Sequence, residues 1–385
     1  MLLIIPFLLL LLPCRFQHPP SLTATTATTA SLCELEMTPA NHTRLVAHVM
    51  LLQSACTFLD PEQARVGKPE EQLGPTHGGH PIDDLLQQAW PTLAAILIQA
   101  SGQDELADEV TSLILKAQRN LSDRFVKWVP HVLSAFEQAL QSRPGPAVLR
   151  AAASIVKGVP AVRPGLPAMS EEQTAIAHFA GVATASTFAA LAGGAIRECP
   201  ELAEGYMHFL AKVTMLHAEV ILTDAVLDGS AAGRPGEGLL HFVGQALLSM
   251  SEPPLVRQTS EALQALCSVA GRLPPLADAL AQATPAWIRG TLEAVAGRAA
   301  SSTVAALGRA LASLCQAAPD VSTRALHEVL RDPTFPFPGA PAEAATNLLK
   351  ALGKARGHPV RFRKAIEDYS GACRRAVLAR PLSAE

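Results

Sequence analysis

The sequence has few aromatic residues and almost no net charge. Its 385 residues include only 12 Phe, 3 Trp and 2 Tyr, and the formal net charge at pH 7 is −3. Alanine and leucine supply most of the apolar side chains, which suits closely packed helices and argues against a β-sandwich or a barrel. A charge this small gives no electrostatic reason to expect direct nucleic-acid binding or an acidic substrate.

Sequence motifs for catalysis are also missing. The chain contains no G-x-S-x-G, no H-E-x-x-H and no C-x-x-C, which excludes the common hydrolase, zinc-protease and paired-cysteine signatures. We therefore predict no enzymatic activity and no catalytic, cofactor-binding or metal-binding residues. The widely spaced cysteines are expected to be free thiols buried in helices of a protein from a reducing compartment. They are Cys14, Cys33, Cys56, Cys199, Cys267, Cys315 and Cys373.

A few polar clusters invite a chemical interpretation, and each has a simpler structural one. Two histidines around a glycine pair are expected in a surface turn, and four acids at the start of a helix are favoured there by the helix dipole. The glycine-rich segment 228–238 lacks the G-K-[ST] ending of a phosphate-binding loop. Four isolated histidines are expected in the core or in a groove. The residues concerned are His77 and His80, then Asp104, Glu105, Asp108 and Glu109, and finally His178, His208, His217 and His241.

Residues 80–159 organise the prediction of the fold. Apolar residues recur there at helical spacing in four successive segments, which predicts two helical hairpins. Pro91 and Pro130 lie 39 residues apart, and each is predicted to kink the first helix of its pair. Two-helix units of about 40 residues are typical of HEAT and armadillo repeats.

Helical periodicity continues through the rest of the chain. A helix is predicted for 41–60, another for 171–191 with 200–227 as its partner, and a short one for 239–250. The last third reads as three hairpins whose first helices open at Pro253, Ser301 and Ala342. The predicted fold is all-α, a right-handed HEAT/armadillo-type superhelix of about six to eight hairpins that bury their apolar faces on one another.

The expected domain organisation follows from these segments. Residues 1–13 form an apolar run too short for a membrane span, so it is either a signal-like leader or an artefactual start, and no stable membrane insertion is expected. Residues 14–79 are expected to be partly disordered, with a possible remnant repeat helix at 41–60. The repeat array is assigned to 80–378 and a tail to 379–385.

A basic stretch stands out near the C-terminus, where eight cations are offset by only Glu367 and Asp368. It is either a set of solvated helix faces or a surface for an acidic protein partner. RNA is disfavoured because no aromatic residues are interleaved for base stacking. The cations are Lys350, Lys354, Arg356, Arg361, Arg363, Lys364, Arg374 and Arg375.

The order and the local sequences of the hairpins resemble the C-terminal part of the karyopherins, the importin-beta superfamily, in the transportin-SR and importin-thirteen branch. The resemblance spans roughly residues 41–375. It depends on four stretches, which are His80-Pro-Ile-Asp-Asp-Leu-Leu-Gln-Gln-Ala-Trp-Pro-Thr-Leu, Phe125-Val-Lys-Trp-Val-Pro-His-Val-Leu, Ser301 to Leu330 with Ala-Pro-Asp between its helices, and Phe362-Arg-Lys-Ala-Ile-Glu-Asp-Tyr-Ser-Gly-Ala-Cys-Arg-Arg.

The resemblance implies a nuclear transport receptor that shuttles between nucleus and cytoplasm. Its partners would be protein cargo, the Ran GTPase and FG nucleoporins. Members of this family are longer and more acidic, and the repeats that mainly clasp Ran are missing here, so the chain is expected to be a fragment and no family binding residue is transferred to it. Two alternatives remain: a generic α-solenoid scaffold without a role in transport, and a secretory protein if the leader is functional.

Overall fold

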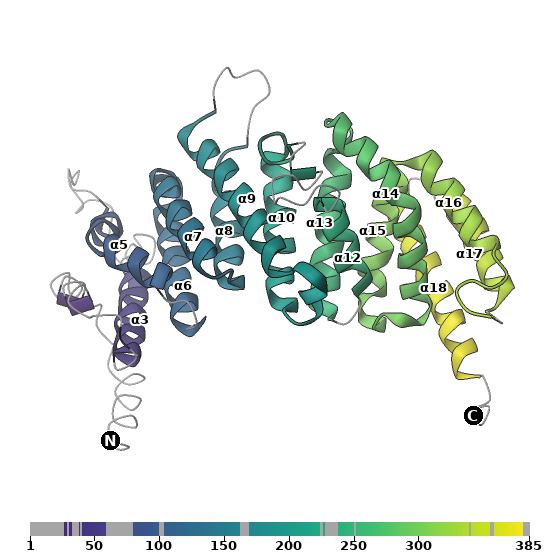
Figure 1. The fold of residues 1–385 in the computed structure, drawn as a ribbon, viewed down its shortest axis with the longest axis horizontal. Coiled ribbons are helices and arrows are strands. Elements are labelled where there is room, and N and C mark those ends of the chain that lie inside the picture. Colours follow the sequence, from purple (N-terminus) through teal and green to yellow (C-terminus); the bar gives the residue numbers. More distant parts are fainter. Residues whose placement is uncertain are drawn as a thin grey trace, which may run out of the picture. The chain divides into compact units, whose positions relative to one another are not determined.

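The structure is a computed structural model of the chain (Figure 1). All its regular elements, within the residues that it describes, are helices, as the sequence predicted. The chain divides into two compact units, residues 1–143 and 144–385, which are described separately; the domain bounds expected from the sequence stay a prediction. The described residues are 27–28, 31–32, 38, 41–58, 80–99, 104–161, 169–223, 226–227, 238–249, 252–338, 340–354 and 358–379.

Unit 1 is built around α6. This helix packs on both α3 and α5, and α5 also packs on α7. The apolar stripes predicted from the sequence are buried: Leu85, Leu93 and Ile96 of α5 and Leu113 of α6 are at most 5% exposed. The elements are α3 (His42–Phe58), α5 (Pro81–Gln99), α6 (Asp104–Leu121), the 3-10 helix η2 (Ser122–Trp128) and α7 (Val129–Ser142).

The two aligned prolines play different parts, so the predicted pair of kinked helices is half wrong. Pro91 does lie inside α5. Pro130, however, is in the first turn of α7, because η2 occupies the positions where the helix was expected to begin. A proline there costs no hydrogen bond, since the first backbone N–H groups of a helix have no partner within it. The two prolines therefore do not occupy equivalent positions in their helices.

Asp83 ties the first turn of α5 to η2. Its carboxylate accepts a hydrogen bond from Trp128 Nε1 at 2.7 Å and forms an ion pair with Lys127. Burial pushes the pKa of this carboxyl upward, but the bonds from Lys127 and Trp128 outweigh it and the net pKa is below its usual range. The ionised form is thus the one that the fold stabilises.

Substitution of Asp83 by alanine is expected to destabilise unit 1 by about 1 kcal/mol, because the indole of Trp128 loses its acceptor. Since the folded state lowers this pKa, the contribution is present above the unfolded-state value of about 4 and is lost as the pH falls below it. The adjacent Asp84 is exposed and supplies the control, Asp84→Ala. Amide hydrogen exchange of α5 and η2 measures both; equal losses in the two variants would refute the role of Asp83.

Unit 2 consists of two rows of helices, each helix packed on the next in its row. The first row is α8, α10, α13, α15 and α18, the second is α12, α14, α16 and α17, and α9 packs on α10. The bounds are α8 (Pro146–Lys157), α9 (Glu171–Ala190), η3 (Ala192–Arg197), α10 (Pro200–Ile221), α12 (Leu239–Ser249), α13 (Pro253–Ala270), α14 (Pro274–Glu293), the π turn η5 (Ala294–Arg298), η6 (Ser301–Thr303), α15 (Val304–Ala317), α16 (Pro319–Arg331), α17 (Ala342–Lys354) and α18 (Pro359–Leu378).

Two predictions for unit 2 need correction. The helix opening at Ala342, α17, was expected to follow the helices that open at Pro253 and Ser301, but it lies in the other row, and α18 is the helix that packs on α15. Periodicity identifies a helix without saying which row it joins. The helix expected at 200–227 ends at Ile221, after a non-helical residue, His217.

A cluster of aromatic rings holds the α9–α10 pair and α12 together. The Tyr206 ring lies 5.7 Å from that of Phe188 and 5.6 Å from that of Phe242, centroid to centroid. Its hydroxyl lies 2.9 Å from Thr184 Oγ1, which itself donates to the Ala180 carbonyl, so the Tyr206 O–H donates to Thr184. Three of the chain's few aromatic residues, Phe188, Tyr206 and Phe242, therefore meet at one junction of helices.

Glycine allows a close helix contact in the second row. A Cβ atom on Gly244 of α12 would lie 2.5 Å from Nε1 of Trp287 on α14, and Trp287 is 4% exposed. By contrast, a Cβ atom on Gly181 of α9 would have nothing within 4 Å. One helical glycine is thus required by packing and the other is not.

Candidate protein-docking groove

Of the acidic cluster at the start of α6, Glu109 takes part in the packing of unit 1, and Glu105 and Asp108 are exposed. Glu109 accepts from Gln53 Nε2 on α3 through its carboxylate at 2.5 Å and its backbone oxygen at 2.7 Å, and Lys116 Nζ donates to Gln53 Oε1 at 2.9 Å. His80 Nδ1 accepts from the Ile82 N–H at 3.2 Å, and His77 lies outside the described residues. In the described part of the chain no three His, Cys, Asp or Glu residues are grouped to hold a metal ion.

The four isolated histidines do not share one environment, so the expectation of core or groove positions is only partly right. His178 and His241 are exposed, and His241 bonds to Gln245 at 2.7 Å. His208 is half-buried and lies 3.1 Å from Gln258 Oε1. His217 alone is in the core, at 1% exposure. Apolar neighbours in the sequence did not reveal these differences, because successive residues of a helix point to different faces.

His217 predicts a pH dependence of stability. Burial lowers its pKa, and the neighbouring Val156 backbone opposes this only in part. Below pH about 6.5, His217 is therefore protonated in the unfolded chain but not in the folded chain. Unit 2 is expected to lose stability as the pH falls through that region. The His217→Gln variant should lose this dependence while His241→Gln keeps it, as measured by hydrogen exchange of α10 at several pH values; equal slopes in both would count against the assignment.

The expectation that the cysteines are buried free thiols is only partly met. Those in the described residues form no disulfide; Cys56 and Cys373 are buried, Cys267 and Cys315 are half-buried, and Cys199 is exposed. Burial raises the pKa of the Cys56 thiol to about 12 and, with a contribution from Cys315, that of Cys267 to about 12. Thiols with such a pKa are weak nucleophiles, and nothing here indicates a reactive site.

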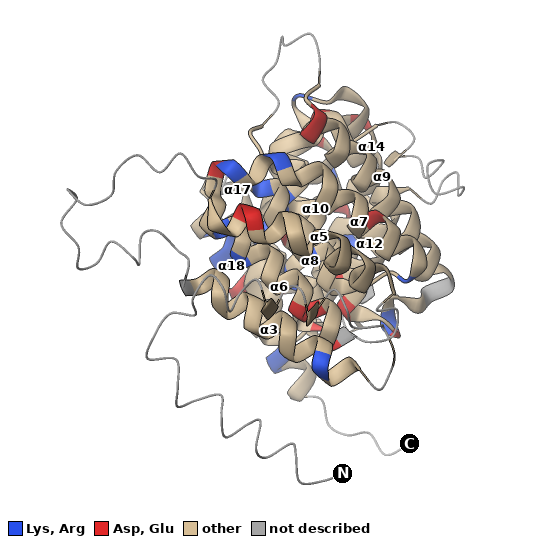
Figure 2. Cartoon of the chain, turned by 90° about the vertical axis from the view of Figure 1, so that its left-hand side faces the viewer, with Lys and Arg blue, Asp and Glu red and all other residues tan. Residues whose placement is uncertain are grey.

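The basic stretch near the C-terminus is partly structural. Arg374 donates to the Ala299 backbone oxygen at 2.5 Å and to Ser370 Oγ at 3.1 Å, and Arg363 is paired with Glu367 at 3.4 Å. Figure 2 shows acidic positions among the basic ones around α17 and α18. The side chains of Lys354 and Arg356 are not among those that the structure describes. Four of the eight predicted cations are exposed, namely Lys350, Arg361, Lys364 and Arg375.

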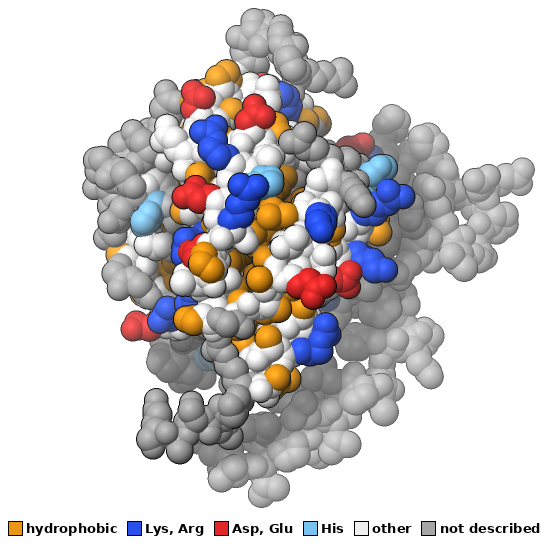
Figure 3. Space-filling model, turned by 90° about the vertical axis from the view of Figure 1, so that its right-hand side faces the viewer, with side chains coloured by type: hydrophobic (Ala, Val, Ile, Leu, Met, Phe, Trp, Pro, Cys, Tyr) orange, Lys and Arg blue, Asp and Glu red, His pale blue; other side chains and the backbone are white. Residues whose placement is uncertain are grey.

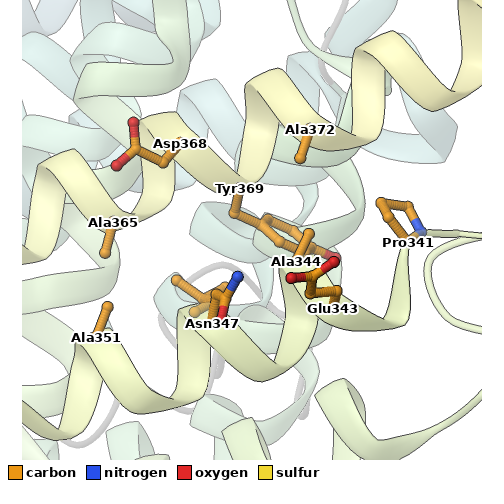
Figure 4. Close-up of a pocket in the computed structure, with 10 residues that line it drawn as sticks. Pro341, Glu343, Ala344, Asn347, Ala351, Ala365, Asp368, Tyr369 and Ala372 are labelled. Atoms are coloured by element: carbon orange, nitrogen blue, oxygen red, sulfur yellow. The ribbon is translucent and has the colours of Figure 1, made fainter.

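A groove of about 330 Å³ lies between α17 and α18 (Figure 4). Its alanines recur seven residues apart on each helix, which places each pair on one helix face. This repeat of small residues, together with the two acids beside it, is the signal that the sequence analysis missed. The lining residues are Pro341, Glu343, Ala344, Asn347, Leu348, Ala351, Ala365, Asp368, Tyr369 and Ala372.

Tyr369 forms the buried part of the groove. Its side chain is 3% exposed, and Figure 4 shows the ring between the two helices with its hydroxyl end towards Glu343. Burial, and then the neighbouring Cys373 thiol, raise the pKa of this hydroxyl above its usual range. A thiol is a weak partner, and within the described residues no group meets the hydroxyl with full hydrogen-bond geometry. The neutral phenol is therefore the form that the groove contains.

Figure 3 shows apolar side chains gathered across the middle of one face of the molecule, with charged side chains on both sides of them. An apolar centre with a polar rim is the usual pattern of a protein-docking surface. None of the described helices is long and apolar enough to cross a membrane.

Comparison with known proteins identifies the fold. No protein-family profile matches the chain, and no curated protein sequence matches it. Among solved structures, one described as the cytosolic state of importin 13 matches with a TM-score of 0.70 over 92% of this chain, at 11% sequence identity. The chain has an importin-type HEAT fold. It spans 38% of the length of the matched importin chain. The predicted all-α helical-repeat fold is thus confirmed, and the importin-beta resemblance is confirmed for the fold; the identity is too low to fix the branch.

Proposed function

We propose that the chain is a protein-binding part of an importin-type nuclear transport receptor. It binds protein cargo through helix faces of its repeats and works with the Ran GTPase and FG nucleoporins while shuttling between cytoplasm and nucleus. The importin-type fold over 92% of the chain is the observation that supports this proposal. The apolar side chains gathered on one face agree with it (Figure 3), because partners of repeat proteins are held by many modest contacts spread over helix faces.

Under this proposal the chain has no enzymatic activity and needs no cofactor. Binding and release of partners then depend on small rotations between neighbouring helix pairs, which alter the surface that a partner meets. The chain spans less than half of the matched importin. The proposal therefore covers only the contacts that the helices of this chain can make.

Capture by the immobilised full chain tests the proposal. We expect it to retain a nucleoporin fragment with Phe-Gly repeats and to release the same fragment after each Phe is changed to Ser. Ran loaded with GTP should be retained in preference to Ran loaded with GDP. Retention of neither protein would overturn the proposal and favour a generic α-solenoid scaffold.

Cellular location distinguishes the proposal from the secretory alternative. A fluorescent protein fused to the full chain is expected in both nucleus and cytoplasm. A second reporter, fused behind residues 1–30 alone, should stay inside the cell. Its secretion would support the secretory alternative and contradict the assignment to nucleus and cytoplasm.

A further inference from the structure

The connection between α16 and α17 begins with a turn that one aspartate holds together. Oδ1 of Asp332 accepts hydrogen bonds from the Thr334 hydroxyl at 2.6 Å and from the Thr334 N–H at 2.9 Å. The Asp332 backbone carbonyl accepts from the Phe335 N–H at 3.1 Å. Aspartate and proline are favoured at the first two positions of such a β-turn, and Pro333 fills the second. Two of the three hydrogen bonds that hold the turn therefore come from Thr334.

A cation from a neighbouring helix lies against the same turn. Nη2 of Arg289 on α14 is 3.8 Å from Oδ2 of Asp332, and the guanidinium carbon is 5.5 Å from the centre of the Phe335 ring. Nε of Arg289 also lies 3.4 Å from a carboxylate oxygen of Glu293. Phe335 is 6% exposed, whereas the side chain of Thr334 is exposed. One arginine thus faces two carboxylates, and the Thr334 hydroxyl lies at the surface beside them.

The sequence places Arg331, which is exposed, three residues before this threonine. A large class of protein kinases selects substrates by an arginine at this spacing, through charge complementarity. In the part of the chain that the structure describes, the pattern Arg-x-x-Ser/Thr ends at Ser122, Ser260, Ser301 and Thr334. Ser260 is buried, and Ser122 and Ser301 are the first residues of 3-10 helices. Of these four acceptors only Thr334 lies outside a helix, and a kinase reaches a surface turn most easily.

We propose that Thr334 is a phosphorylation site of an arginine-directed protein kinase, and that its phosphate opens the Asp332 turn. The kinase transfers the γ-phosphoryl group of MgATP to Thr334 Oγ1. The Oγ1–P bond forms, the bond from the γ-phosphorus to the bridging oxygen breaks, ADP leaves, and the hydroxyl proton passes to the catalytic aspartate of the kinase. The product has a charge of about −1.5 to −2 at pH 7.

The phosphate reverses the interaction that holds the turn. Unmodified Thr334 donates its hydroxyl proton to Asp332. Phosphorylation removes this donor and puts a negative group beside a carboxylate that is ionised at pH 7. Arg289 then pairs with the phosphate, because arginine binds phosphate through strong, often bidentate hydrogen bonds, and its contact with Asp332 is lost.

Opening of the turn affects the surface that follows it. The same connection leads to Pro341, which lines the α17–α18 groove. Phosphorylation of Thr334 is therefore a means of altering how the start of α17 is held, through a change of charge at one turn. The site itself does not depend on the proposed transport function.

Peptide mapping by mass spectrometry tests the site on the full chain. The chain is incubated with MgATP and either a cyclic-AMP-dependent or a calmodulin-dependent protein kinase, both arginine-directed. We expect phosphate at Thr334, and an Arg331→Gln variant modified about tenfold more slowly there, the effect of one lost charge-assisted hydrogen bond. Arg324→Gln removes another exposed arginine of α16 and should match the wild type. No phosphate at Thr334 with either kinase, or equal rates in both variants, overturns the proposal.

Amide hydrogen exchange tests the effect on the turn. In peptides that cover residues 332–338, phosphorylation is expected to speed exchange about fivefold or more, since the turn loses a hydrogen bond and gains a repulsion. The Asp332→Asn variant keeps an acceptor for Thr334 without the charge, so its phosphorylation should speed exchange less. Unchanged or slower exchange in the phosphorylated wild type, or an equal increase in Asp332→Asn, contradicts the proposed opening.

The site and the transport function fail separately. A chain that is phosphorylated at Thr334 but captures neither Ran nor Phe-Gly repeats retains the site and loses the importin assignment. A chain that captures both proteins but takes no phosphate at Thr334 loses only the site.

Discussion

Replacing Tyr206 by alanine is expected to destabilise unit 2 by about 3–5 kcal/mol, the range for truncating a buried aromatic side chain. Tyr206 is 1% exposed and its ring meets Phe188 and Phe242 edge-on. Removing the ring leaves a cavity where three helices meet, and it also removes the donor to Thr184. Since the chain has two compact units, amide hydrogen exchange resolved by helix is the suitable measurement, because it reports α9, α10 and α12 separately from unit 1.

The Tyr206→Phe variant is the matched control. It keeps the ring and removes only the hydroxyl, so a loss of about 1 kcal/mol is expected. Thr184 still donates to the Ala180 carbonyl in that variant, which limits the cost. A loss in Tyr206→Phe as large as in Tyr206→Ala would show that the hydroxyl, and not the ring, holds this junction together.

Substituting Gly244 by alanine is the second large effect that we expect, about 1–3 kcal/mol of destabilisation from overpacking. The new methyl group would lie 2.5 Å from Trp287 Nε1. The indole is buried and rigid, so α12 and α14 must move apart. This cost exceeds the gain of up to about 1 kcal/mol that alanine brings in a helix.

The matched substitution Gly181→Ala is expected to have the opposite sign. Nothing lies within 4 Å of its Cβ position in α9, so only the lower conformational entropy of the unfolded chain remains, a stabilisation of about 0.5–1 kcal/mol. Protection factors of α12 and α14 for one variant and of α9 for the other measure this. Changes of the same sign in both would mean that the α12–α14 spacing does not depend on Gly244.

The sequence predicted most helices because their stability depends on one buried face, and a buried face leaves a period of 3.6 residues. Leu106, Val110, Leu113 and Ala117 show this in α6, and all four are fully buried. Such periodicity does not show at which residue a helix begins, so Pro130 was assigned to a helix interior instead of a first turn. It also does not say which row a helix joins, so α17 was placed beside the wrong neighbours.

The candidate groove could not be predicted in the same way. Each wall comes from a different helix, and the residues that matter, Glu343, Asn347 and Asp368, are ordinary exposed positions in the sequence. Asp368 was counted only as one of two acids in a basic stretch. Its place beside the groove arises only when α17 and α18 come together, which no pattern within a single helix reports.

The link between α18 and η5 helps to explain how such a fold persists while its sequence changes. Ser370 Oγ donates to the Val295 carbonyl at 2.6 Å, and Arg374 donates to that of Ala299. Both acceptors are main-chain atoms that every amino acid provides. Positions 295 and 299 can therefore change to other small, apolar residues without loss of either hydrogen bond. Two related sequences can thus diverge a long way while both keep this attachment.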